Sequence, residues 1–155
     1  MLSGEIYLKN VTKDNQHLKA LISKLDEHLF KLYPSEGIFG LDLNSSKAME
    51  TTFALAYIGD TPVGCGAIRP LDFENIELKR FYVDINYRNN GIATKLLRFL
   101  EKQAEYLSFK TMLLETGNKQ PEAIGLYRKN GYIEVAPFGD YIGCENSICF
   151  AKKIG

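Results

Sequence analysis

The sequence predicts an α+β fold, with helices flanking a mixed sheet in which a mostly antiparallel meander of strands leads into a strand–helix–strand unit. Three observations support this prediction. Apolar and polar residues alternate in several short segments, as in a half-buried strand. In three longer segments apolar residues recur every three or four positions, as on one face of a helix. The order of these segments along the chain gives the meander first and the strand–helix–strand unit after it.

The expected elements follow one another with short turns between them. A first strand at 5–11 gives way, after Thr12 and Asp14, to a helix with apolar positions from Leu18 to Leu32, and Pro34 ends that helix. Residues 35–47 are rich in turn-forming types and leave room for a short helix. Strands are then expected at 51–58, 62–68, 75–83, 111–116, 132–135 and 147–153, a hairpin turn at Gly59 and Asp60, and helices at 91–107 and 121–130.

Length and composition predict one globular domain over residues 1–155, because no linker, repeat or low-complexity tract divides the chain. Lysine plus arginine and aspartate plus glutamate both total 19, so net charge attracts neither nucleic acid nor an anionic membrane. Cys65, Cys144 and Cys149 lack the spacing of a zinc site and are odd in number, which favours reduced, core-packed thiols. With no signal peptide or membrane-spanning run, we expect a cytoplasmic protein, and a homodimer is compatible with the sequence.

The stretch YRNNGIATKLL, from Tyr87 to Leu97, places a basic residue and a glycine directly before an apolar helical run. The free N–H groups of a helix start attract an anion such as phosphate. Gly91 would let the backbone approach the anion closely, and Arg88 would neutralise its charge. The glycines follow neither the dinucleotide-binding nor the P-loop spacing. By itself the stretch fits an ordinary helix start and a phosphate site equally well.

In context, the chain resembles the GNAT acetyltransferase superfamily over roughly residues 50 to 150. The family's phosphate-binding motif, [R/Q]-x-x-G-x-[G/A] between a strand and a long helix, is matched here by Arg88-Asn89-Asn90-Gly91-Ile92-Ala93. Three further stretches match in order: ELKRFYV on the preceding strand, LLETG on the following strand, and AIGLYRKNGY from Ala123 to Tyr132. The resemblance implies a mainly antiparallel sheet with a central, splayed pair of parallel strands.

The resemblance also implies acetyl-coenzyme A (acetyl-CoA) as donor and a primary amine as acceptor, without a metal. The main chain at Phe81, Tyr82 and Val83 would pair with the pantetheine arm. The pyrophosphate would lie on the backbone amides of Arg88, Asn89, Asn90, Gly91, Ile92, Ala93 and Thr94. A further coenzyme contact is usually made by an asparagine where this chain has Gln120, and Asn118 is the substitute that lies nearby.

Two residues are expected to carry the chemistry. An amine must lose a proton before it attacks, and Glu77 matches the glutamate that serves as base in several members of the family. The alternative for Glu77 is a solvent-facing strand position, since two-residue alternation would place it beside Lys79 and Phe81. Tyr127 matches the family's tyrosine that protonates the departing thiolate, and its alternative is an aromatic filling the gap between helix and sheet. We expect His17 and His28 on the surface.

The sequence says least about the identity of the acceptor substrate. Four acidic residues could attract a cationic amine or could be ordinary loop charges: Glu36, Asp42, Asp140 and Glu145. Three aromatic residues could form an apolar wall of the acceptor site or could pack in the core: Phe39, Phe138 and Tyr141. The leading prediction is an N-acetyltransferase acting on a small-molecule amine by direct attack in a ternary complex. The alternatives are an acetyltransferase of protein lysines or N-termini and a non-catalytic coenzyme A sensor.

Overall fold

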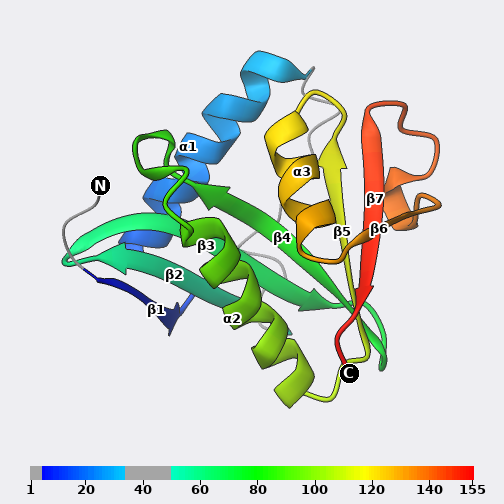
Figure 1. Cartoon of the computed structure of the whole chain (residues 1–155), viewed down its shortest axis with the longest axis horizontal. Coiled ribbons are helices and arrows are strands. Elements are labelled where there is room, and N and C mark those ends of the chain that lie inside the picture. Colours follow the sequence, from blue (N-terminus) through cyan, green and yellow to red (C-terminus); the bar gives the residue numbers. More distant parts are fainter. Residues whose placement is uncertain (1–4, 34–49) are drawn as a thin grey trace.

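The computed structural model describes residues 5–33 and 50–155, and within them seven strands form one mixed sheet in the order β1-β2-β3-β4-β5-β7-β6 (Figure 1). This confirms the α+β prediction, and each strand and helix expected in the described residues is present. The strands are β1 (Ile6–Val11), β2 (Thr52–Ile58), β3 (Thr61–Pro70), β4 (Asn75–Val83), β5 (Thr111–Gly117), β6 (Ile133–Val135) and β7 (Ser147–Lys153). The helices are α1 (Gln16–Leu32), α2 (Ile92–Tyr106), α3 (Pro121–Lys129) and the short 3₁₀ turns η3 (Ile85–Tyr87) and η4 (Gly139–Tyr141).

Within the described residues, β4 and β5 are the one parallel pair of strands, and they lie in the middle of the sheet. Strands β1 to β4 pair antiparallel as a meander, α2 connects β4 to β5, and β5, β7 and β6 pair antiparallel again. The pairing of β4 with β5 covers only Asn75–Glu77 against Thr111–Leu113. Beyond these residues the two strands part, as Figure 1 shows, and β4 keeps only β3 as its neighbour. The expected splayed pair is confirmed.

Helix α1 begins and ends where the sequence predicts. The side chain of Asn15 accepts hydrogen bonds from the backbone N–H groups of His17 (2.9 Å) and Leu18 (3.1 Å), which caps the helix. The last helical residue is Leu32, and Tyr33 caps the C-terminus in an extended conformation. Pro34, which was expected to stop the helix, lies outside the described residues, as do 35–47.

The two faces of the sheet carry different helices because the strand side chains alternate. Phe53, Leu55 and Tyr57 of β2 pack with the apolar face of α1. Ala54, from the same strand, packs on the opposite face with a larger cluster that includes Leu96 and other α2 residues. Complete burial of a leucine stabilises a fold by about 1.5–3 kcal/mol, so these faces hold the helices against the sheet.

A bulge interrupts the alternation in β4. Lys79 stands opposite Ala67 and Tyr82 opposite Cys65, so one extra residue of β4 is accommodated, and Arg80 there has a φ of 53°. The faces of the strand therefore exchange after Arg80. The prediction that Glu77 and Lys79 share a face with Phe81 is wrong, because Phe81 packs with the cluster of α2 and α3.

None of the helices in the described part of the chain combines the length and apolar character needed to cross a membrane. Cys65 and Cys149 are buried free thiols, as expected for core residues, while the free thiol Cys144 is half-buried.

Candidate active site

A cleft of about 950 Å³ opens where β4 and β5 part. Its walls come from α1, β4, the start of α2, β5 and α3, and Tyr141 also lines it. Although the chain has no net charge, the lysine and arginine residues that line the cleft (Lys79, Arg80, Arg88, Lys119 and Lys129) outnumber its glutamates (Glu115 and Glu122). The cleft is therefore suited to an anionic ligand.

The start of α2 forms one end of the cleft. Gly91 is the N-cap of the helix with a φ of 79°, a conformation that favours glycine, and Asn89 is also left-handed with a φ of 65°. The first backbone bond of the helix runs from the N–H of Lys95 to the oxygen of Gly91. The amides of residues 92–94 consequently have no acceptor within the helix and are available to an anion.

Side chains hold the loop before α2 in place. Asn90 donates from its amide nitrogen to the backbone oxygens of Tyr87 (3.1 Å) and Arg88 (2.9 Å). The Nε of Arg88 donates to the backbone oxygen of Val83 at 2.9 Å, and its guanidinium lies over the ring of Tyr82. Arg88 thus fixes its positive charge beside the available amides.

The predicted coenzyme residues are distributed unevenly around the cleft. Those that line it are Phe81, Tyr82, Val83, Arg88, Asn89, Gly91, Ile92, Ala93, Thr94 and Gln120. Asn90 faces the loop backbone instead, and the exposed Asn118 is not a lining residue. Of the two candidates for the further coenzyme contact, Gln120 therefore has the better position.

Tyr127 lies between the cleft and the core. Its side chain is only 6% exposed, and its ring contacts Phe81, Tyr132 and Phe150 at centroid distances of 5.8–6.3 Å. Burial, reinforced by the negative charge of Glu115, raises the pKa of Tyr127 above that of an ordinary phenol. The hydroxyl therefore stays protonated at neutral pH and can act as a donor. The ring fills the core as the alternative interpretation required, and the residue also lines the cleft.

Glu77 is 1% exposed, so the alternative of a solvent-facing position is wrong. One carboxylate oxygen accepts from Arg69 at 2.7 Å, and the other accepts from the hydroxyl of Tyr141 at 2.5 Å. The same hydroxyl accepts from Nζ of Lys79 at 2.9 Å, and that nitrogen lies 3.8 Å from Glu77. We call Arg69, Glu77, Lys79 and Tyr141 the Glu77 cluster. Lys79 and Tyr141 line the cleft, whereas Glu77 lies behind them.

Tyr141, His28 and Glu115 line the cleft but were not among the predicted site residues. Tyr141 was expected as an apolar wall or core residue, but its hydroxyl is central to the Glu77 cluster. His28 was expected on the surface, yet it is half-buried, lines the cleft and has its pKa lowered by burial and by Arg88. Glu115 lies in the quoted LLETG stretch, but only the register of the folded sheet, in which Leu113 pairs with Glu77, shows that it lies close to the Glu77 cluster.

The acidic loop residues do not gather at the cleft. Asp140 and Glu145 are exposed and are not lining residues, so an attraction of the acceptor by these two carboxylates has no support. Glu36, Phe39 and Asp42 lie outside the described residues. In the described part of the chain no group of three or more histidine, cysteine, aspartate or glutamate side chains could hold a metal ion.

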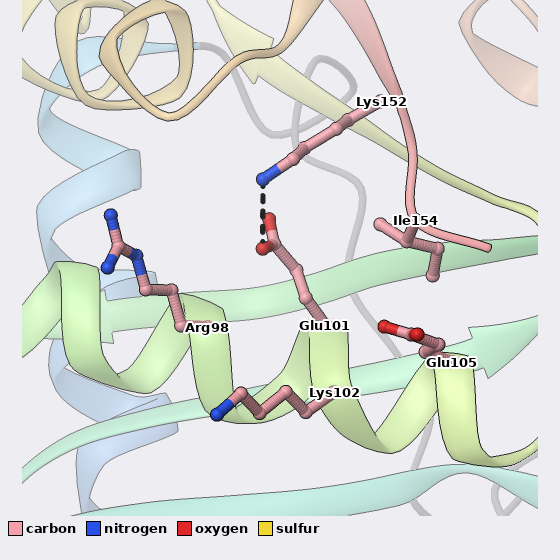
Figure 2. A pocket seen from close by; sticks show the side chains of 6 residues that line it. All are labelled: Arg98, Glu101, Lys102, Glu105, Lys152 and Ile154. Atoms are coloured by element: carbon pink, nitrogen blue, oxygen red, sulfur yellow. Dashed lines mark hydrogen bonds and ion pairs between the residues drawn. The ribbon is translucent and has the colours of Figure 1, made fainter.

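A second, smaller hollow of about 350 Å³ lies between α2 and the end of β7. Figure 2 shows Lys152 reaching from β7 to Glu101 of α2, with 3.0 Å between Nζ and Oε1. The other oxygen of Glu101 accepts from the hydroxyl of Tyr132 at 2.7 Å. These contacts tie α2 to the far half of the sheet, and we assign the hollow a structural role.

The family model described as "Acetyltransferase (GNAT) family" matches residues 18–132, which include α2, Tyr127 and all the lining residues of the cleft except Tyr141 and Asn146. The chain belongs to the GNAT family. The resemblance seen in the sequence is thereby confirmed, and the protein is an acyltransferase that uses acetyl-CoA.

Individual GNAT relatives agree with this assignment. The chain is 40% identical over 123 residues to an IAA acetyltransferase of Azospirillum brasilense, covering 78% of this chain and 80% of that protein. It is 31% identical over 141 residues to an uncharacterized N-acetyltransferase, YsnE, of Bacillus subtilis (strain 168), covering 88% and 93%. A protein of Klebsiella pneumoniae assigned as an acyl-CoA N-acyltransferase has the same fold, with a TM-score of 0.87, 28% identity and coverage of 99% and 100%.

Proposed function

We propose that this GNAT enzyme transfers an acetyl group from acetyl-CoA to a primary amine of a small molecule, by direct attack in a ternary complex. One observation carries the proposal: a single cleft joins the free amides at the start of α2 to Tyr127 and to the Lys79 and Tyr141 side chains of the Glu77 cluster. A GNAT acetyltransferase of Elizabethkingia anophelis, which shares this fold with a TM-score of 0.73 and 19% identity, has been solved with acetyl-CoA bound, and we infer the same donor here.

The coenzyme would lie along β4. The pyrophosphate fits the amides of residues 92–94 beside Arg88, and the pantetheine arm fits the edge of β4 at Phe81, Tyr82 and Val83, which β5 leaves unpaired. In this orientation the thioester would lie near Tyr127.

We propose Glu77 as the base, acting through the hydroxyl of Tyr141. As the amine nitrogen bonds to the thioester carbonyl carbon, its proton moves to the Tyr141 oxygen while the Tyr141 proton moves to Glu77. The 2.5 Å contact between the two side chains supports this path, and Glu77 itself lies behind the wall of the cleft. Arg69 holds the carboxylate in position at 2.7 Å.

Tyr127 completes the transfer. When the bond between the carbonyl carbon and sulfur breaks, coenzyme A leaves as a thiolate, and we propose that the protonated Tyr127 hydroxyl donates a proton to it. The released products are the acetylated amine and coenzyme A. Solvent then reprotonates Tyr127 and removes the proton from Glu77. The free core thiols Cys65 and Cys149 favour a reducing compartment, and we propose the cytoplasm.

The deciding experiment measures free thiol released from acetyl-CoA with a panel of amines, amino acids, polyamines and lysine peptides. We expect release with at least one small amine and little with the peptides. Tyr141→Phe removes the relay oxygen and should lower turnover at least tenfold, with the pH profile of turnover changed in the same way as in Glu77→Gln. Release with peptides alone would overturn the small-molecule acceptor, and tight coenzyme binding without any release would indicate a sensor.

A further inference from the structure

We infer that the acceptor carries a carboxylate as well as its amine, and that Lys79 and Glu115 recognise these two groups from opposite sides of the gap between β4 and β5. This inference rests on the proposed function and specifies its substrate class. Amines without an acidic group, such as polyamines, would then be poor acceptors.

The register of the parallel strands brings the two side chains to the same place. Asn75, Ile76 and Glu77 pair with Thr111, Met112 and Leu113 before the strands part. Continued in that register, Lys79 would stand opposite Glu115. Because alternate residues of a strand share a face, both side chains lie on the side of the sheet that carries Glu77. The bulge at Arg80 begins only after Lys79, so it does not disturb this placement.

Lys79 has a positive charge that its neighbours neutralise incompletely. The residue is 7% exposed, and its ammonium donates to the neutral hydroxyl of Tyr141. The carboxylate of Glu77 lies 3.8 Å away and already accepts from Arg69 and Tyr141. An ammonium has three N–H donors, and a buried charge is costly unless an opposite charge meets it. A substrate carboxylate in the cleft would supply that charge.

Glu115 carries the opposite charge on the other side of the gap. One of its oxygens accepts from the hydroxyl of Ser147 at 2.7 Å, a partner that carries no charge. In the described part of the chain no ion pair within 4 Å joins Glu115 to Lys79, although the two interact electrostatically across the gap. Desolvation raises the pKa of Glu115 and lowers that of Lys79, as expected for charges held short of partners. The N–H groups of a bound, neutral amine would satisfy Glu115, which lies close enough to Tyr127 to raise the pKa of its hydroxyl.

The test compares acceptors that differ only in the carboxylate. Each of several amino acids, with α-, β- and γ-amino groups, is assayed beside its amide and its decarboxylated amine, and kcat/KM is measured by thiol release. We expect at least one acid to exceed its amide tenfold or more, since a site built for a charged group rejects the analogue that lacks it. Lys79→Met should reduce this ratio towards one, whereas Lys102→Met, on the exposed side of α2, should leave it unchanged.

The ratio is the decisive quantity because any general loss of activity in Lys79→Met affects both substrates equally. Glu115→Gln should raise KM for the same acids more than it lowers kcat. If Lys79→Met does not fold, a simple carboxylic acid without an amine should still inhibit the native enzyme competitively against the acceptor, and its amide should not. Native turnover with ratios near one, or no such inhibition, would overturn this inference alone. Absence of turnover with every amine would instead overturn the proposed function.

Discussion

At the residue scale, the role of the Tyr127 hydroxyl can be tested separately from the packing of its ring. Tyr127→Phe keeps the contacts with Phe81, Tyr132 and Phe150 and removes only the oxygen. We expect turnover to fall by about tenfold or more, up to the ~10²–10⁴ typical of a positioned acid, while acetyl-CoA affinity and melting temperature change little. Steady-state kinetics and thermal unfolding of the same preparation check both parts.

The matched control is Tyr57→Phe. Tyr57 is also a buried tyrosine, but its hydroxyl contacts His17 on the α1 side of the sheet and does not line the cleft. Its removal should leave turnover unchanged. Equal turnover in native enzyme and a folded Tyr127→Phe variant would show that Tyr127 only packs the core.

At the scale of elements, Asp84 joins α1 to the turn before α2. It accepts from Nζ of Lys24 at 2.8 Å and from the backbone N–H of Asn86 at 3.0 Å. Burial alone would raise the pKa of Asp84, but these hydrogen bonds outweigh it and hold the pKa below its ordinary value. A carboxylate whose pKa is depressed in the folded state stabilises the fold above its unfolded pKa of about 3.9. That stability is lost as pH falls through the lower, folded pKa.

Asp84→Asn should therefore lower the free energy of unfolding at pH 7, and this loss should become smaller as the pH falls. Because Lys24 is half-exposed and screened by solvent, we expect a loss of about 1 kcal/mol, which corresponds to ~2–4 °C in melting temperature at this length. Thermal unfolding at pH 7 and near pH 3, beside the exposed turn variant Asp60→Asn, measures the difference. A deficit that stays constant with pH would contradict the role of the charge.

The bulge in β4 depends on a glycine opposite it. A Cβ added at Gly66 would lie 2.8 Å from Leu100 and 3.1 Å from Phe81. Gly66→Ala should cost about 1–3 kcal/mol through overpacking. Gly125 of α3 is exposed with no atom within 4 Å of such a Cβ, so Gly125→Ala should instead stabilise the helix by about 0.5–1 kcal/mol. Denaturant unfolding of both variants tests these two predictions. Equal changes in the free energy of unfolding for Gly66→Ala and Gly125→Ala would contradict them.

The sequence predicted elements well where the period of apolar residues is unbroken, as in α1 and β2. It failed inside β4, because a bulge changes which face a residue occupies without changing residue types, and Phe81 was therefore placed on the wrong face. Residues of a contiguous motif, such as Gly91, could be placed at the start of α2 from the sequence alone. The hydrogen bond between Tyr141 and Glu77, on which the proposed relay rests, could not be predicted, since it joins residues 64 positions apart that only the folded chain brings together.

At the scale of the whole molecule, coenzyme binding should stabilise the fold. Ligand at 100 times its dissociation constant adds about 2.7 kcal/mol by mass action. Gly91→Val should abolish most of this gain, because the new side chain would project from the start of α2 into open space that the phosphates need. Gly59→Val is the control: Gly59 also has a positive φ and an open Cβ position, but it lies in the β2–β3 turn. Both variants should lose intrinsic stability, and only the first should lose the thermal shift.

The short contact between β4 and β5 divides the sheet into two halves that hydrogen exchange can distinguish. The ladder between β4 and β5 has only three residue pairs, so the amides of β4 beyond Glu77 on the open edge lack a neighbouring strand. A coenzyme arm seated there would act as a substitute strand. We expect its binding to slow exchange along β4 and in the first turn of α2 while leaving β1 unaffected, which mass spectrometry of exchanged peptides would measure. The substrate would then complete the secondary structure of the enzyme that acts on it.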